Sequence, residues 1–254
     1  MSISLSIITS TYNCLEDFKE TASSIRKVIH LVPLKWIVID GGSNDGTQKE
    51  IVKNADIITY SLSELDSGIY QAWNKALTAV DTPWVMFVGA GDLVNASWIE
   101  TIVNSQESFD CLYGDLELIN ADKRTFLVKS HPWSYVANHI NSDMCLPHAG
   151  MAINASLFSK EKFNENYKII SDWTFLANLP TLTGKHFPGH TQLRFKLGGV
   201  STNFRGLIIS LQEKNHYLRS KGGHLTPRQI INAFINFMVL KNQVFRRLMA
   251  FISS

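Results

Sequence analysis

Short β-rich runs alternate with stretches of helical spacing along the first half of the chain. Strands are predicted at residues 3–9, 35–40, 55–60, 83–89 and 109–115, and helices at 16–30, 45–54, 67–80 and 95–105. Strands that alternate with helices form a mostly parallel sheet with helices on both faces. We therefore expect an α/β fold with a Rossmann-like sheet sandwiched by helices.

Polar residues follow the predicted strands at the points where they end. Residues 9–12 close the first strand, and Asp40, Asp66 and Asp92 follow the second, third and fourth. Ligands of open parallel sheets bind beyond the carboxyl ends of the strands. We expect these strand ends to form one site.

Asp92 ends the stretch "WVMFVGAGD", in which a hydrophobic strand stops at two glycines and one acid. Taken alone, Asp92 could cap a helix that begins near Asn95. Together with Asp40 and Asp66, it indicates an oxygen-ligated cation such as Mg²⁺ or Mn²⁺ with phosphate oxygens.

The pattern loosens after residue 120. A helix is predicted near Asp172, in "IISDWTF", and a strand over residues 190–197 before Gly198 and Gly199. A single histidine such as His148, in "LPHAG", is usually structural, and Asp172 in isolation suits a helix cap.

The charge of the chain is divided unevenly. Residues 1–172 hold 13 Lys and Arg against 21 Asp and Glu, a balance of −8, whereas residues 173–254 hold 11 against one, Glu213, a balance of +10. Such asymmetry indicates an anionic partner for the basic part, which could be a membrane surface, a phosphorylated lipid or nucleic acid.

The C-terminal stretch has the pattern of a basic amphipathic helix, or of two. Thr226 and Pro227 are suited to the cap and first position of a helix. The apolar positions recur at spacings of three and four: Ile230, Ile231, Phe234, Phe237, Met238, Phe245, Leu248, Met249 and Ile252. This helix could lie on a membrane surface or pack against the domain.

The three cysteines form no CxxC pair, and the N-terminus lacks the features of a signal peptide. No run approaches the about 18 apolar residues of a membrane span. We therefore expect a cytoplasmic protein.

The segments "SIITSTYN", "VIDGGSNDGT", "LDSGIYQAWNKAL" and "FVGAGD" together resemble glycosyltransferase family 2, whose fold is GT-A. The later segments "LPHAGMAI", "IISDWTF" and "KLGGVST" resemble the branch that builds bacterial exopolysaccharides and lipopolysaccharide, including colanic-acid-type transferases. The resemblance covers roughly residues 3–205.

The resemblance implies roles for the matching positions. Asp172 would be the catalytic base, Asp92 would hold a divalent Mn²⁺ or Mg²⁺ ion on the donor diphosphate, and His148 would lie near the acceptor or the metal. The implied donor-binding residues are Thr11, Tyr12, Asn13, Asp40, Gly41, Asp66, Gly68, Tyr70, Asn74 and Gly91.

Two positions depart from the family pattern. Gly41 stands where the family often has a second acid that contacts the base of the nucleotide. The Asp-x-Asp metal motif falls on Ala90, Gly91 and Asp92, so only its last acid is present.

The resemblance implies an inverting glycosyltransferase that moves a sugar from a nucleotide-sugar donor to a hydroxyl of a lipid-linked saccharide acceptor in bacterial surface polysaccharide synthesis. Residues 1–205 would form the GT-A domain, with a nucleotide-sugar half (1–115) and an acceptor half (116–205). Residues 206–254 would form a basic amphipathic segment that holds the enzyme on the inner face of the cell membrane.

Three other functions fit the sequence less well. One is a non-catalytic sugar- or nucleotide-binding module associated with a membrane. A sugar-phosphate nucleotidyltransferase would need a Gly-rich basic loop after the first strand, which "TSTYNCLED" is not. Nucleic-acid binding is disfavoured because the aromatic residues of the tail fall on the apolar stripe.

Overall fold

The structure is a computed structural model that describes residues 4–105, 108–120 and 122–241. The chain divides into two compact units. Unit 1 comprises Met1–Asn166 and Ser171–Lys196, and unit 2 comprises Tyr167–Ile170 and Leu197–Ser254. The boundary predicted at residue 205 falls inside unit 2.

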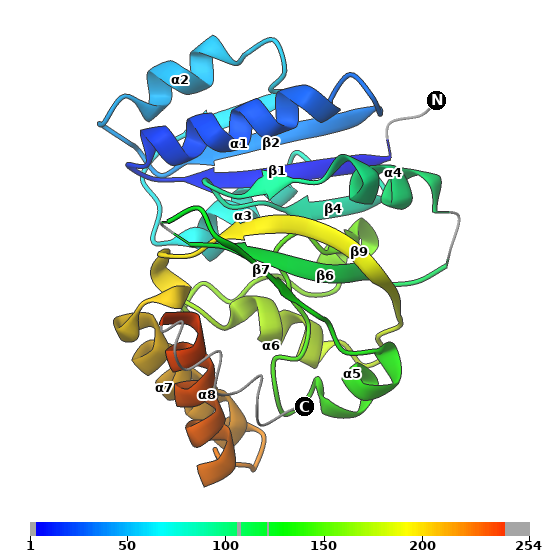
Figure 1. Ribbon diagram of the computed structural model, residues 1–254, viewed down its shortest axis with the longest axis vertical. Helices are drawn as coiled ribbons and strands as arrows, with labels where there is room; N and C mark the ends of the chain where they lie inside the picture. The colour runs from blue at the N-terminus through cyan, green and yellow to red at the C-terminus, as the bar shows by residue number, and fades with distance from the viewer. Residues whose placement is uncertain (1–3, 106–107, 121, 242–254) are drawn as a thin grey trace. The chain divides into compact units, whose positions relative to one another are not determined.

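The described residues of unit 1 form a nine-stranded sheet in the order β3-β2-β1-β4-β8-β6-β9-β5, with β7 paired to β6 (Figure 1). Strands β1 to β4 run parallel, and so do β6 and β9, whereas β8 is antiparallel to both β4 and β6. The strands are β1 (Leu5–Thr11), β2 (Leu34–Asp40), β3 (Tyr60–Ser63), β4 (Trp84–Phe87), β5 (Leu93–Val94), β6 (Cys111–Ile119), β7 (Thr125–Val128), β8 (Ala152–Asn154) and β9 (Gly184–Lys196). The mostly parallel α/β sheet expected from the sequence is confirmed.

The helices of unit 1 are short and amphipathic. They are α1 (Leu15–Val28), α2 (Thr47–Lys53), α3 (Ile69–Leu77), α4 (Ala96–Asn104), α5 (Trp133–His139) and α6 (Ser171–Asn178), with a 3₁₀ turn at Ala155–Ser159. In α1 the side chains of Phe18, Ala22 and Ile25 are buried at the spacing predicted from the sequence.

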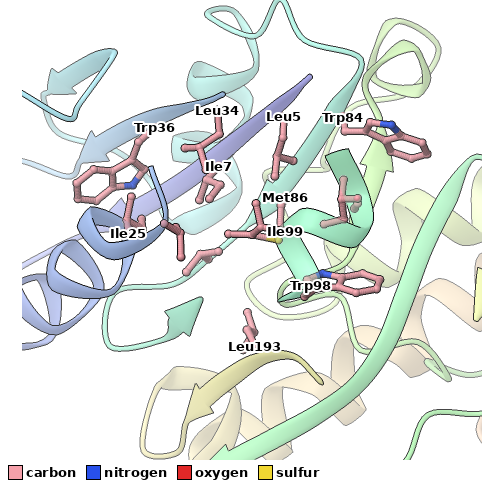
Figure 2. Packing of buried hydrophobic residues seen from close by; sticks show 14 of the residues in the cluster. Leu5, Ile7, Ile25, Leu34, Trp36, Trp84, Met86, Trp98, Ile99 and Leu193 are labelled. Atoms are coloured by element: carbon pink, nitrogen blue, oxygen red, sulfur yellow. The ribbon is translucent and has the colours of Figure 1, made fainter. Parts of the chain in front are cut away.

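Side chains that alternate along the central strands build two buried layers. Leu5 and Ile7 of β1 and Trp36 of β2 belong to one hydrophobic cluster with residues of α1 and α4 (Figure 2). On β4, Met86 belongs to this same cluster (Figure 2), whereas the following side chain, Phe87, points to the other face of the sheet. The ring of Phe87 lies 4.4 Å from that of Trp73 on α3. The parallel strands are thus buried on both faces, which explains their continuous apolar runs.

One predicted strand is wrong. Residues 54–57 form a turn, after which the strand begins only at Tyr60. The N–H groups of Ile57 and Ile58 both donate to the carbonyl of Asn54. The chain needs this turn to return from the end of α2 to the sheet, and Ile57 is buried without being in a strand. The sequence pattern also missed β5, β7, β8, α5 and the first helix of unit 2.

Unit 2 contains α7 (Phe204–Ser220) and α8 (Pro227–Lys241), whose rings Phe204 and Phe237 meet edge to face at 5.8 Å. Helix α8 begins at Pro227 as predicted, and Thr226 Oγ1 accepts the N–H of Gln229. Residues 242–254, with the predicted stripe positions Phe245, Leu248, Met249 and Ile252, lie outside the described residues.

The carboxylate of Glu213, on α7, accepts the backbone N–H groups of Lys168, Ile169 and Ile170. The acid that stands alone in the basic part of the sequence therefore has a bracing role within unit 2. Across the described ranges, every helix is too short or too polar to cross a membrane.

We predict that Trp98→Phe lowers the free energy of unfolding by about 1–3 kcal/mol. The Trp98 ring is fully buried and its Nε1–H donates to the carbonyl of Gly150 at 2.8 Å, so phenylalanine leaves that acceptor unpaired. Urea denaturation measures the change. The exposed Val52→Ala should stay within about 0.5 kcal/mol of wild type. Equal stability of Trp98→Phe and wild type would contradict the packing described.

Candidate active site

Asp40, the last residue of β2, holds the turn that follows it. Its carboxylate accepts hydrogen bonds from the N–H and the hydroxyl of Ser43 and from the hydroxyl of Ser63 at the end of β3. The residue is fully buried. Asp40 therefore fixes the strand-end turn, and its oxygens already have partners within the protein.

The loop after β1 lies against the same turn. The N–H of Asn13 donates to Ser43 Oγ at 2.8 Å, and Asn13 Oδ1 accepts the N–H of Asn44 at 2.9 Å. Asn13 adopts a positive φ of 47°, which asparagine tolerates better than most residues. Thr11 is buried beside Cys14, whereas the side chain of Tyr12 is 62% exposed. The loop thus presents an aromatic ring at the end of the sheet.

Asp66 and Tyr12 both lie against Gly41. A Cβ atom at Gly41 would be 2.9 Å from Asp66 Oδ2 and 3.3 Å from Tyr12 Cδ2. Asp66 Oδ1 accepts the N–H of Gly68 at 3.0 Å, and Gly68, with φ 142°, is the cap of α3. The glycine at position 41 is what allows the carboxylate to come so close to the strand-end turn.

Helix α3 connects this region with Asp172. The hydroxyl of Tyr70, in the first turn of α3, donates to Asp172 Oδ1 at 3.2 Å across 102 residues of sequence. Asp172 lies in the first turn of α6 and is partly exposed, and its Oδ1 also accepts the N–H of Trp173 at 2.8 Å. Tyr70 therefore helps to orient this carboxylate.

Asn74, one turn further along α3, has a structural role. Its amide exchanges hydrogen bonds with the backbone of Phe163 and donates to Glu165 Oε1 at 2.9 Å. The loop that precedes α6 is thus tied to α3 by the amide of Asn74. Glu165 was not anticipated from the sequence, because its partner is 91 residues away.

Asp92 is buried in its own loop. Its Oδ2 accepts the N–H of Gly89 at 3.1 Å, and its Oδ1 accepts the N–H of Lys196, at the end of β9, at 2.9 Å. Burial raises the pKa of Asp92 to about 7, against the influence of both hydrogen bonds. The cap of α4 is Asn95, whose side chain accepts the N–H of Ser97, so Asp92 is not the helix cap considered above.

A cation site requires carboxylate oxygens that face the bound cation. Asp92 is only 4% exposed, and both of its oxygens accept backbone N–H groups. Within the described ranges, no group of three His, Cys, Asp or Glu side chains could hold a metal ion. In this arrangement the carboxylate of Asp92 braces the loop, and the binding of a metal ion there stays a prediction from the sequence.

Gly91 and Lys196 complete this brace. A Cβ at Gly91 would be 2.8 Å from Lys196 Cδ, and the residue has a positive φ of 97°. The Gly91 N–H donates to the carbonyl of Asp17, while the ammonium of Lys196 is paired with the carboxylates of Asp17 and Glu20. Lys196 was missed from the sequence because it meets Asp92 only through the fold.

His148 lies inside an aromatic cluster. Its ring stacks on those of Trp73, at 5.2 Å, and Phe87, at 5.3 Å, and meets the ring of Phe163 edge to face. Only 3% of the residue is exposed, and neither ring nitrogen has a hydrogen-bond partner among the described residues. Burial lowers the pKa of His148 to about 3, so the ring is neutral at pH 7.

The structure therefore places the predicted residues in four groups. Tyr12, Gly41 and Asp66 meet beside the turn held by Asp40, and Tyr70 meets Asp172. Gly91 and Asp92 form a third group in the brace. His148 lies in the aromatic cluster, whose rings Trp73 and Phe163 also contact Tyr70.

Residues 6–167 match the Glycosyl transferase family 2. The chain belongs to glycosyltransferase family 2. The PGL/p-HBAD biosynthesis glycosyltransferase of Mycobacterium bovis is 23% identical over 153 residues, which cover 55% of this chain and 55% of that protein. The family 2 chain thus spans about half the length of the curated relatives it matches.

Solved structures of low sequence identity share the fold. TarS from S. aureus, in complex with UDP-GlcNAc, has a TM-score of 0.63 and 15% identity, over 97% of this chain and 84% of that one. The mannosyltransferase PcManGT from Pyrobaculum calidifontis, in complex with GDP-Man and Mn²⁺, has a TM-score of 0.59 and 15% identity, over 92% of this chain and 70% of that one. The expected GT-A fold is confirmed.

We predict that His148→Phe gains stability relative to wild type as the pH falls from 7.5 to 5. The unfolded histidine takes up a proton near pH 6.5 but the buried ring does so only near pH 3, so the wild type loses about 2 kcal/mol between pH 6.5 and 5. Urea denaturation of both proteins at each pH gives the difference.

The comparison cancels the opposite contribution of Asp92, which both proteins carry. Because the folded pKa of Asp92 is raised to about 7, its contribution to stability falls as the pH rises through the interval from about 4 to 7. A difference between His148→Phe and wild type that stays constant with pH would show that the imidazole is not buried and unpaired as described.

Proposed function

We propose that this family 2 protein is an inverting glycosyltransferase that moves a sugar from a nucleotide-sugar donor to a hydroxyl of a saccharide acceptor. The observation that carries the proposal is the hydrogen bond between Tyr70 and Asp172. This bond joins α3, whose cap Gly68 donates to Asp66, to the carboxylate of Asp172 on α6.

Asp172 is proposed as the general base. A hydroxyl is a weak nucleophile, and a carboxylate within hydrogen-bond reach accepts its proton as attack proceeds. The acceptor oxygen then forms a bond to the anomeric carbon while the bond from that carbon to the diphosphate breaks. One displacement with one base inverts the anomeric configuration.

The donor is proposed to lie along the ends of β1 and β2. The exposed ring of Tyr12 and the carboxylate of Asp66 meet there beside Gly41. The relatives with known ligands contain UDP-GlcNAc or GDP-Man, which supports a nucleotide sugar without naming the sugar.

A divalent ion at Asp92 stays a prediction from the sequence. Such an ion, when bound to a donor diphosphate, neutralises the charge that develops on the leaving group. One structural relative contains Mn²⁺. To bind this ion through a freed oxygen, the carboxylate of Asp92 would first have to give up a backbone partner. The role proposed for Asp172 does not depend on the ion.

Asp172→Asn should lower the rate of transfer by about 10²–10⁴-fold while the protein stays folded, because asparagine can still accept the Trp173 N–H but cannot take a proton. Release of nucleoside diphosphate in the presence of acceptor measures the rate. Asp81→Asn, at an exposed carboxylate paired with Lys35, is the matched control and should keep the wild-type rate. Near-normal turnover of Asp172→Asn would remove Asp172 from its role.

The acceptor is proposed to be lipid-linked and the protein to bind the cytoplasmic face of the cell membrane through unit 2. While Phe237 packs on α7, four other apolar residues of α8 are exposed: Ile230, Ile231, Phe234 and Met238. Residues 197–254 hold eight Lys and Arg and one acid. An exposed apolar stripe in a basic segment is typical of a helix that lies in an anionic membrane interface.

The double variant Ile231→Ser, Phe234→Ser should lose most of its binding to vesicles that contain phosphatidylglycerol, because the buried apolar area falls. Vesicle flotation measures the bound fraction. Leu65→Ser removes an 81% exposed apolar side chain from unit 1 and should bind as wild type does. Unchanged flotation of the double variant would contradict a membrane contact through α8.

A further inference from the structure

The carboxylates of Asp40 and Asp66, near the end of β2, differ in the number of hydrogen bonds that they accept. Asp40 is fully buried and accepts three hydrogen bonds from Ser43 and Ser63. Asp66 is partly exposed and uses Oδ1 for the N–H of Gly68. No hydrogen bond to Asp66 Oδ2 is found among residues 4–105, 108–120 and 122–241. Asp66, and not Asp40, therefore has an oxygen to offer a ligand.

The free oxygen has a defined position. The hydrogen bond to Gly68 fixes the carboxylate, and Oδ2 lies 2.9 Å from the point where a Cβ of Gly41 would be. Tyr12 Cδ2 lies 3.3 Å from the same point, and most of the Tyr12 side chain is exposed. A hydrogen-bond acceptor and an aromatic ring thus flank a backbone position that has no side chain.

These two groups suit a flat ring that carries an N–H on its edge. Aromatic side chains provide stacking surfaces for nucleobases. An ionised carboxylate only accepts hydrogen bonds, so it selects a base edge that donates. With Oδ1 already engaged, one oxygen matches one ring N–H, which is the edge of uracil or thymine. Guanine offers two adjacent donors, and cytosine and adenine each have an acceptor at the corresponding ring nitrogen.

We propose that Asp66 Oδ2 accepts the ring imide N–H of the donor's base while Tyr12 packs on the base, and that the donor is a uridine or thymidine diphosphate sugar. This inference rests on the proposed function, since it assigns a base to the donor of that reaction. It gives Asp66 a role in specificity and leaves Asp40 to hold the turn.

Asp66→Asn separates this role from a structural one. The amide oxygen can still accept the Gly68 N–H, so the cap of α3 is kept. The amide nitrogen then takes the place of Oδ2 and presents a donor to the base. A donor repels the imide N–H of uracil and suits the ring nitrogen of cytosine.

The experiment measures dissociation constants of the full chain for UDP, dTDP, CDP, GDP and ADP by calorimetry, with Mg²⁺ present. Wild type should bind UDP or dTDP most tightly. Asp66→Asn should raise the dissociation constant for UDP by about tenfold or more and shift the preference of the protein from UDP toward CDP. Gly41→Ala, whose methyl group would crowd Asp66 Oδ2, should also weaken the binding of UDP.

Glu64→Gln is the matched control. It neutralises an acid on the same connection, which is paired with Lys75, and should bind UDP as wild type does. Thermal unfolding without ligand checks that each variant is folded.

The outcomes separate this inference from the proposed function. Tightest binding of CDP, GDP or ADP, or an unchanged order of nucleotides in Asp66→Asn, would overturn the role of Asp66 and leave a glycosyltransferase with a different base contact. No binding of any nucleoside diphosphate to wild type would overturn both.

Discussion

The parallel strands β1, β2 and β4 are buried on both faces, so the turns at their carboxyl ends must be held by groups that the strands themselves bring. The carboxylates of Asp40 and Asp92 serve this purpose. Asp40 accepts the N–H of Ser43, and Asp92 accepts those of Gly89 and of Lys196 at the end of β9. Unpaired backbone groups in such a place would cost about 1–3 kcal/mol each. The acids nearest the sheet are therefore used to shape the site.

The acids that remain for chemistry lie one step further out. Asp66 accepts the N–H of Gly68, the cap of α3, and keeps an oxygen beside Gly41, while Tyr70 in the first turn of α3 donates to Asp172. The first turn of α3 thus links the region proposed for the donor base with the proposed catalytic base.

The sequence predicted the α/β class and most elements of the first half because strand runs and helical spacing are local patterns. It could not predict β5 and β7, which are short, or the brace between Asp92 and Lys196, which spans 104 residues. Family resemblance pointed to Asp66, Tyr70 and Asp172, and the structure groups them. It could not tell that Asp92 is turned into its loop and His148 into an aromatic cluster, because burial depends on the whole fold.

The central claim is that Asp40 and Asp92 hold the strand-end loops while Asp66 contacts the donor base. Its most direct test is a crystal structure of the full chain with UDP and Mn²⁺. The account predicts that Asp40 and Asp92 keep their backbone partners and that Asp66 Oδ2 lies within hydrogen-bond distance of the ring N–H of uracil. A structure in which Asp92 leaves the N–H groups of Gly89 and Lys196 to bind the metal, with Asp66 remote from the base, would contradict it.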